Sequence, residues 1–162
     1  MKHLRIIPTP EPAVELTPWM TCLEIEAIER LLHSDWHVLE YGSGGSTTWL
    51  SARVDRVTSI EHDQNWGGDI HQVASNVDLR LVPPEWPLKK RFGPAEPGQF
   101  ESYVAAADDI SPNLVIVDGR DRVRCAERWT RKSLVLLHDA NRRRYQSLNL
   151  QFICESLAIV KP

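Results

Sequence analysis

Four short runs of polar residues each follow an apolar segment, and their residue types suit a ligand-binding site. The runs are Glu40 to Gly45, Glu61 to Asp63, Asp118 to Arg120, and His138 to Asn141. Carboxylates and imidazoles exchange protons or accept hydrogen bonds from hydroxyl groups, and arginines bind anions. Glycines let a backbone approach a ligand closely. If the apolar segments are parallel strands, the four runs lie at one edge of a sheet, where ligands of such sheets bind.

The apolar segments alternate with stretches of helical periodicity. Strands are predicted at 37–42, 57–63, 77–82, 113–119 and 133–140, and helices at 17–33, 47–54, 64–74, 100–107 and 121–132. Thr17 is expected to cap the first helix, with Pro18 at its first position. This alternation predicts an α/β fold, a Rossmann-like doubly wound and mostly parallel sheet with helices on both faces. We expect an N-terminal arm over 1–16, one domain over 17–162, and a long loop over 83–98.

Composition restricts the class of protein. The chain has 162 residues, of which 42% are hydrophobic and 25% charged, and its net charge of −3 disfavours general nucleic-acid binding. No apolar run approaches the roughly 20 residues that cross a bilayer, and prolines interrupt the N-terminus, so we expect a cytoplasmic protein that does not bind membranes. Three widely spaced cysteines, Cys22, Cys125 and Cys154, are expected to be free thiols.

The glycine-rich turn after the first strand is informative together with Glu61. Gly42, Ser43, Gly44 and Gly45 resemble a dinucleotide-binding turn that lacks its third glycine. Glu61 lies 19 positions after Gly42, at the end of the next strand, where a carboxylate can accept hydrogen bonds from both hydroxyls of a ribose. A tight strand-to-helix turn without a ligand is the structural alternative.

The segments VLEYGSGGSTTWL, VTSIEHD and VIVDG together resemble the class I S-adenosylmethionine-dependent methyltransferases, over residues 38–141. The resemblance implies that Glu40 lies near the methionine amino group of the cofactor. It places the glycine loop of residues 42–45 beside the methionine and ribose, and Glu61, with His62 next to it, at the ribose hydroxyls. The chain departs from the family at Ser46, where a third glycine is usual. It also leaves little room for the antiparallel strand pair that usually closes the sheet, so we expect a shortened C-terminal end.

Asp118, His138 and Asp139 are the candidate catalytic residues. Asp118 and Asp139 end neighbouring predicted strands, which resembles small-molecule O-methyltransferases whose carboxylates there hold a divalent cation such as Mg²⁺. Ala140 separates Asp139 from Asn141, which departs from that pattern. His138 offers a metal-free base for a hydroxyl proton. The structural alternatives are a helix cap for Asp118 and a strand-end hydrogen bond for His138.

Other residues are candidates for the acceptor pocket. Arg120 and Arg142 can bind a carboxylate or phosphate of the acceptor, or else form part of a solvated basic face. The aromatic residues Trp66, Trp86 and Phe92 can line a pocket or pack in the core.

The sequence favours a methyltransferase that uses S-adenosylmethionine and acts on a small-molecule acceptor at a hydroxyl oxygen. A non-catalytic nucleoside-binding domain or partner subunit of the same fold is the alternative. A nicotinamide-dependent oxidoreductase is disfavoured by the incomplete glycine fingerprint. A homo-oligomer is compatible with the sequence.

Overall fold

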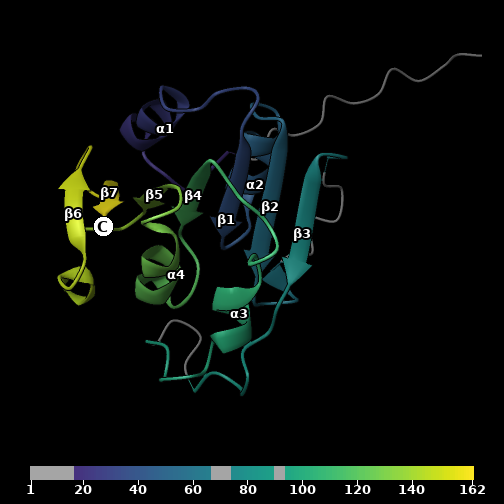
Figure 1. The fold of residues 1–162 in the computed structure, drawn as a ribbon, viewed down its shortest axis with the longest axis vertical. Helices are drawn as coiled ribbons and strands as arrows, with labels where there is room; N and C mark the ends of the chain where they lie inside the picture. The colour runs from purple at the N-terminus through teal and green to yellow at the C-terminus, as the bar shows by residue number, and fades with distance from the viewer. Residues whose placement is uncertain (1–16, 67–73, 90–93) are drawn as a thin grey trace, which may run out of the picture.

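The computed structural model describes residues 17–66, 74–89 and 94–162, and in it seven strands form one sheet (Figure 1). The strands are β1 (His37–Tyr41), β2 (Arg56–Glu61), β3 (Val77–Leu81), β4 (Leu114–Val117), β5 (Leu134–Leu137), β6 (Asn149–Phe152) and β7 (Ala158–Lys161). Their order across the sheet is β3-β2-β1-β4-β5-β7-β6. β1 to β5 are parallel, and β7 runs antiparallel to both of its neighbours. The predicted Rossmann-like, mostly parallel α/β fold is confirmed.

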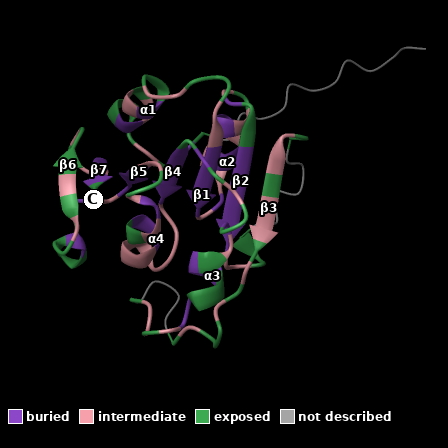
Figure 2. Cartoon of the chain, in the orientation of Figure 1, coloured by how far each residue is buried: buried purple, intermediate pink, exposed green. Residues whose placement is uncertain are grey.

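Helices cover both faces of the sheet. Successive side chains along each strand point to opposite faces, so both faces carry apolar side chains that need a covering layer. The helices are α1 (Cys22–Glu29), α2 (Gly45–Ser51), α3 (Glu101–Ala105) and α4 (Arg122–Trp129), with a short 3-10 helix η2 (Arg143–Tyr145). Leu39 and Tyr41 of β1 pack with α3 and α4, whereas Val38 packs with α1 and α2. The central strands are therefore buried on both faces, while β3 and β6 are partly exposed at the edges (Figure 2).

The register of the parallel strands brings their carboxyl ends level. Tyr41 is aligned with Ile60 of β2 and with Val117 of β4, and Val117 is aligned with Leu137 of β5. The residues that follow these positions must therefore emerge at one edge of the sheet. The helix α4 begins at the same edge, because Asp121, the residue directly before α4, follows soon after the end of β4.

The first helix begins later than its sequence predicts. Thr21, and not Thr17, caps α1: its hydroxyl accepts a hydrogen bond from the backbone of Glu24, whose carboxylate accepts one from the backbone of Thr21 at 2.8 Å. This reciprocal capping box satisfies two backbone donors at once, which the Thr17-Pro18 start does not offer.

The C-terminal end holds an antiparallel strand pair, for which the sequence analysis expected little room. β6 and β7 pair over four residues each, and Ala158 of β7 aligns with Leu137 of β5. Residues 153–157 connect the two strands, and the Ile153 amide donates to the Leu157 carbonyl at 2.9 Å. The two C-terminal strands are short, with four residues each, and they complete the sheet.

Some predictions fall on residues outside the described ranges, namely the arm over 1–16 and most of the helix over 64–74. Within the described parts of the 83–98 loop there is no helix or strand, as predicted. No helix in the described part of the chain is long and apolar enough to cross a membrane.

Candidate functional site

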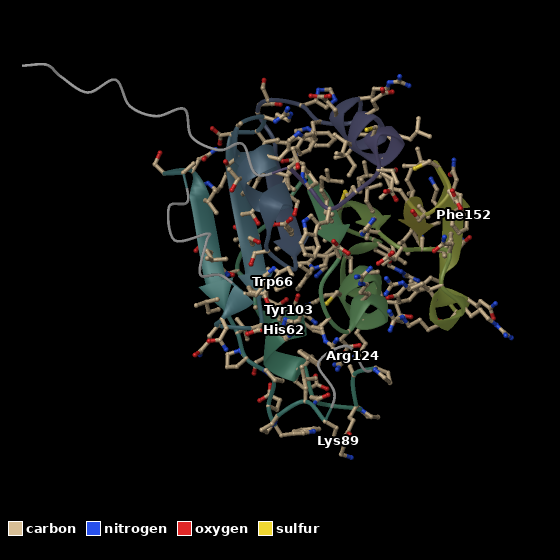
Figure 3. The ribbon with its side chains drawn as sticks, turned by 180° about the vertical axis from the view of Figure 1, so that it is seen from behind. His62, Trp66, Lys89, Tyr103, Arg124 and Phe152 are labelled. Carbon is tan, nitrogen blue, oxygen red and sulfur yellow. The ribbon has the colours of Figure 1, made fainter. Side chains whose placement is uncertain are left out.

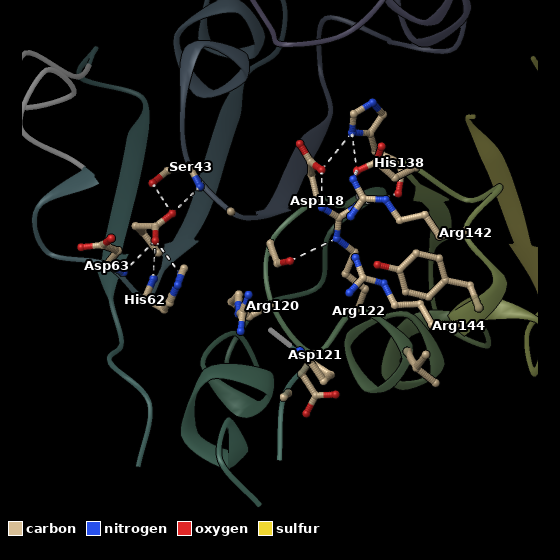
Figure 4. A pocket seen from close by; sticks show the side chains of 18 of the residues that line it. Ser43, His62, Asp63, Asp118, Arg120, Asp121, Arg122, His138, Arg142 and Arg144 are labelled. Atoms are coloured by element: carbon tan, nitrogen blue, oxygen red, sulfur yellow. Dashed lines mark hydrogen bonds and ion pairs between the residues drawn. The ribbon is translucent and has the colours of Figure 1, made fainter. Parts of the chain in front are cut away.

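A cleft of about 570 Å³ opens at the carboxyl ends of the parallel strands (Figure 4). The structure brings together there most of the site residues expected from the sequence: Gly42, Ser43, Glu61, His62, Asp118, Arg120, His138, Asp139 and Arg142. Glu40, Gly44 and Gly45 are not among the residues that line it. Further lining residues that the sequence analysis did not single out include Trp19, Asp121 and Tyr145.

Glu61 fastens the end of β2 to the glycine loop. One carboxylate oxygen, Oε2, accepts hydrogen bonds from the Ser43 amide at 3.0 Å and the Ser43 hydroxyl at 3.2 Å. The other, Oε1, accepts from the amides of His62 and Asp63, both at 2.7 Å. Burial alone would raise the pKa of Glu61, but hydrogen bonds from His62 and from the Asp63 backbone outweigh burial and lower it. Glu61 is thus an anionic acceptor at the wall of the cleft.

Aromatic side chains surround this end of the cleft. His62 lies edge-on to Phe100 and Tyr103, with ring centroids 5.8 and 6.2 Å apart. Figure 3 shows His62 and Tyr103 next to each other. The indole N–H of Trp66 donates to the Ser43 carbonyl at 2.8 Å, and Trp19 packs against the Trp66 ring at 5.5 Å. Of the aromatic residues proposed for the pocket, Trp66 lines the cleft, Trp86 does not, and Phe92 lies outside the described residues.

Glycines bring two strand-end loops into direct contact. Gly42 has a φ of +95°, and a Cβ added there would lie 2.7 Å from the Cα of Gly119, which follows Asp118. A Cβ on Gly119 would lie 2.1 Å from the Tyr103 hydroxyl. The absence of a side chain at Gly119 therefore allows the two loops to approach each other. The Asp118-Gly119 pair after a buried strand is the feature of the sequence that indicates this role.

Gly119→Ala is expected to destabilise the fold by about 2 kcal/mol, because overpacking against a buried ring and a backbone strains both. Gly44→Ala is the matched control. Its added Cβ would meet only the Trp66 indole nitrogen at 3.9 Å, an ordinary contact distance. Urea denaturation of both variants measures the difference, and equal stabilities would contradict the packing account.

Glu40 lies beneath the glycine loop and does not reach the cleft wall. It is fully buried and accepts hydrogen bonds from the hydroxyls of Thr47 at 2.6 Å, Ser59 at 2.7 Å and Ser46. Burial raises the pKa of Glu40 to about 7, despite these three hydroxyl donors. Glu40 therefore supports the start of α2, and its contact with a cofactor stays a prediction.

The three candidate catalytic residues form one cluster with two arginines. A carboxylate oxygen of Asp118, one of Asp139 and a ring nitrogen of His138 all lie within 4.8 Å of one another. Arg122 bonds Asp118 at 2.8 Å and Asp139 at 3.2 Å, and Arg142 bonds Asp139 at 2.6 Å. A guanidinium group is permanently protonated, so these carboxylates are already neutralised by fixed charges. Both carboxylates are paired with arginines here, and the binding of a divalent cation by Asp118 and Asp139 stays a prediction.

His138 connects the cluster to α1. Its Nδ1 donates to Asp118 Oδ1 at 2.9 Å, and its Nε2 lies 3.5 Å from the buried carboxylate of Glu24. Burial alone would lower the pKa of His138, but the hydrogen bond to Asp118 and the charges of Asp139 and Glu24 outweigh burial and raise it. With carboxylates at both nitrogens, the charged imidazolium is favoured, which makes His138 a poorer proton acceptor than its sequence position indicates.

Comparison with known proteins addresses the fold. No protein-family model matches the sequence, and no curated protein matches it. A methyltransferase-like protein from Silicibacter pomeroyi is 26% identical, with a TM-score of 0.68 over 90% of this chain and 88% of that one.

The chain has a methyltransferase fold. Precorrin-6Y C5,15-methyltransferase from Geobacter metallireducens is similar over 93% of this chain and 90% of that one, with a TM-score of 0.58 and 13% identity. Precorrin-8W decarboxylase from Methanobacterium thermoautotrophicum is similar over 75% of this chain and 64% of that one, with a TM-score of 0.50 and 17% identity. At these identities the likeness concerns the fold alone, so the reaction must be argued from the site.

Proposed function

We propose that the protein binds S-adenosylmethionine and transfers its methyl group to a small-molecule acceptor, at a hydroxyl oxygen. The observation that carries the proposal is the anionic carboxylate of Glu61, fixed to the glycine loop at the wall of the cleft. Ribose hydroxyls are the donors that such a carboxylate recognises. The likeness to a methyltransferase-like protein over nine-tenths of the chain supports the same cofactor class.

The described residues fit this cofactor. A cleft of about 570 Å³ falls within the range of about 300 to 1,000 Å³ that small-molecule sites occupy. Glu61 and Ser43 would hold the ribose, and Trp66 and Trp19 would line the site beside the glycine loop. When bound, S-adenosylmethionine supplies an already activated methyl group, so the protein mainly has to orient the acceptor and receive its proton.

Asp118 is the proton acceptor that the geometry favours. Its contacts with Arg122 and His138 in the described part of the chain both use Oδ1, which leaves Oδ2 for a hydroxyl proton. The side chain is 28% exposed and lines the cleft. Arg122 and His138 hold the carboxylate in one orientation.

The same ion pairs favour a second candidate, a non-catalytic cofactor-binding domain. Both strand-end carboxylates are bonded to arginines, and His138 is held between Asp118 and Glu24. If these contacts persist with ligand, the protein binds the cofactor without removing a proton. Binding and methyl transfer must therefore be measured separately.

Calorimetric titration with S-adenosylmethionine and S-adenosylhomocysteine tests the cofactor site. Binding near 1 μM, about −8 kcal/mol, is expected for the wild type. Glu61→Gln should weaken it by about 100-fold, since hydrogen bonds to a charged group contribute about 1.5 to 3 kcal/mol each. Glu127→Gln, an exposed carboxylate on α4, is the control and should bind normally.

Folded wild-type protein that binds neither adenosyl ligand, or that prefers NAD, would overturn the proposed function. If binding is found, release of S-adenosylhomocysteine in the presence of hydroxylated small molecules tests transfer. The acceptors that count in this test are those that bind the protein loaded with cofactor. If the protein binds the cofactor but transfers no methyl group to any of these acceptors, the non-catalytic candidate is favoured.

A further inference from the structure

Tyr145 is a buried tyrosine that lines the cleft. The chain has three tyrosines, and all three lie in the core of the fold. Tyr41 and Tyr103 are fully enclosed, whereas Tyr145 is 4% exposed and belongs to the residues that line the cleft. The small part of Tyr145 that stays exposed therefore faces the cleft.

The hydroxyl groups of the other two tyrosines have partners within the protein. The Tyr41 hydroxyl donates to the Val104 carbonyl at 2.9 Å and accepts from the indole N–H of Trp129 at 3.1 Å. The Tyr103 hydroxyl donates to the Ile60 carbonyl at 3.4 Å. Buried hydroxyls normally have such partners, because a buried polar group without one costs free energy.

The Tyr145 hydroxyl has no such partner. In the part of the chain that the structure describes, no hydrogen bond involves this hydroxyl, and it is not sealed from solvent. The backbone of Tyr145, in contrast, is bonded on both sides: its amide donates to the Arg142 carbonyl at 3.0 Å, and its carbonyl accepts from the Leu148 amide at 3.0 Å. The fold thus fixes the position of Tyr145 while its hydroxyl can still bond a ligand in the cleft.

The ring of Tyr145 is also held in place. It belongs to the hydrophobic cluster that packs between the sheet and helices α3 and α4. The guanidinium carbon of Arg144 lies 5.2 Å from the centroid of the ring. A side chain that is already held loses little rotamer freedom when a ligand binds, so less of the binding free energy is lost.

Tyr145 lies on the side of the cleft away from the proposed ribose site. Glu61 ends β2 and η2 follows β5, and β1 and β4 lie between these two strands. Neighbouring strands are about 4.8 Å apart, so the ends of β2 and β5 are separated by about 14 Å. Figure 4 shows Arg144, the residue before Tyr145, on the opposite side of the site from Ser43 and His62.

The surroundings of Tyr145 combine a carboxylate with apolar side chains. Asp118 comes directly after β4, the strand next to β5 in the sheet. Val123 and Ala95 line the cleft and pack against the same hydrophobic cluster to which Tyr145 belongs. This end of the cleft therefore suits a molecule with an apolar body and oxygen substituents.

We propose that Tyr145 is an acceptor-binding residue, whose hydroxyl donates a hydrogen bond to an oxygen of the methyl acceptor. This inference rests on the proposed function, which assigns the Glu61 end of the cleft to the cofactor. The bonded oxygen is not the one that receives the methyl group, since a hydrogen bond donated to that oxygen would lower its nucleophilicity, whereas Asp118 accepts its proton. The acceptor class is accordingly a small molecule with an apolar body and at least two oxygen substituents.

Titration of the protein saturated with S-adenosylhomocysteine tests the contact. The probes are the three dihydroxybenzenes, which carry two oxygens on one ring, and phenol, which carries one. A parallel series omits S-adenosylhomocysteine. At least one dihydroxybenzene should bind the wild type about 5-fold more tightly than phenol does, as expected for one added hydrogen bond.

Tyr145→Phe removes the hydroxyl and keeps the ring. The preference for that dihydroxybenzene over phenol should disappear, while the affinities for phenol and for S-adenosylhomocysteine stay unchanged. The urea midpoint should remain within about 0.2 M of the wild type, because no hydrogen bond among the described residues is lost.

Tyr41→Phe is the matched control, since it also removes a buried tyrosine hydroxyl. That hydroxyl has two partners within the protein, and Tyr41 does not line the cleft. The urea midpoint should fall by about 1 M, because the Val104 carbonyl and the Trp129 indole N–H lose their partner. The preference for a dihydroxybenzene should persist in this variant.

The outcomes separate the Tyr145 contact from the cofactor assignment. Normal binding of S-adenosylhomocysteine with no dihydroxybenzene preferred over phenol, or with a preference that persists in Tyr145→Phe, overturns the contact alone. A urea midpoint that falls as far in Tyr145→Phe as in Tyr41→Phe also overturns it, since the hydroxyl would then stabilise the fold. Weaker binding of S-adenosylhomocysteine by Tyr145→Phe would place the hydroxyl at the cofactor and overturn the contact too. If S-adenosylhomocysteine fails to bind the wild type, the proposed function fails, and the series without it still decides whether Tyr145 binds a second oxygen.

Discussion

Glu24→Ala is expected to lower the free energy of unfolding by about 3 kcal/mol, although Glu24 lies on a short helix outside the cleft. The carboxylate is 2% exposed and accepts hydrogen bonds from the Thr21 amide at 2.8 Å and from the Ser156 hydroxyl at 2.5 Å. It also lies 3.5 Å from Nε2 of His138. Loss of the helix cap costs about 1 kcal/mol, and loss of hydrogen bonds to a buried charge costs about 2 kcal/mol more.

The control is Glu26→Ala on the same helix. Glu26 forms an exposed ion pair with Arg30 at 3.2 Å, and such pairs contribute about 0.5 kcal/mol or less. Urea denaturation at pH 5.5 should therefore separate the two variants clearly. Equal losses in the two would show that Glu24 is held in place without contributing to stability.

The Glu24 effect should depend on pH in a defined direction. Burial alone would raise the pKa of Glu24, but hydrogen bonds from Ser156 and Thr21 and the charge of His138 lower it from 4.5, so its stabilisation declines as the pH falls below 4.5. The pKa of His138 is raised from 6.5, so the stabilisation from its charge declines as the pH rises above 6.5. The contribution of the Glu24 and His138 pair is thus greatest between pH 4.5 and 6.5.

The contact between Glu24 and His138 shows what the sequence alone can and cannot predict. Parallel pairing follows from alternating apolar strands and helices, so the convergence of Glu61, Asp118 and His138 at one edge was predictable from their places after strands. The Glu24 contact joins residues 114 positions apart across a helix and a strand end, and no local pattern indicates it. Arg122 likewise pairs with Asp118 and Asp139, and no local pattern indicates that pairing, because contacts among side chains depend on tertiary geometry.

The face of the sheet on which the Glu40 side chain lies could be predicted in part from the sequence. Residues in a strand alternate between faces, so Glu40 shares the face of Val38 and opposes Leu39 and Tyr41. Val38 packs against α2, which places Glu40 beneath that helix, next to Ser46 and Thr47. The family resemblance pointed to the cofactor, whereas strand periodicity indicates a buried position.

Glu40→Gln should change how stability depends on pH. The pKa of Glu40 rises from 4.5 to about 7 on burial, and 1 pH unit corresponds to about 1.4 kcal/mol. Because the folded state binds this proton more tightly than the unfolded chain, wild-type stability declines as the pH rises from 4.5 to 7 and is level above that. The variant lacks this decline, so its stability relative to wild type should increase by about 3 kcal/mol between pH 4.5 and 8.

Denaturant unfolding at several pH values measures this difference, with Glu127→Gln on the exposed face of α4 as the control. A difference between Glu40→Gln and wild type that does not vary with pH would mean that Glu40 is ionised throughout the range. Cofactor titration of the same variant then separates the two roles of Glu40. If the carboxylate binds the methionine ammonium group, Glu40→Gln weakens S-adenosylhomocysteine strongly; if it only supports α2 through Thr47 and Ser59, binding changes little while the pH dependence disappears.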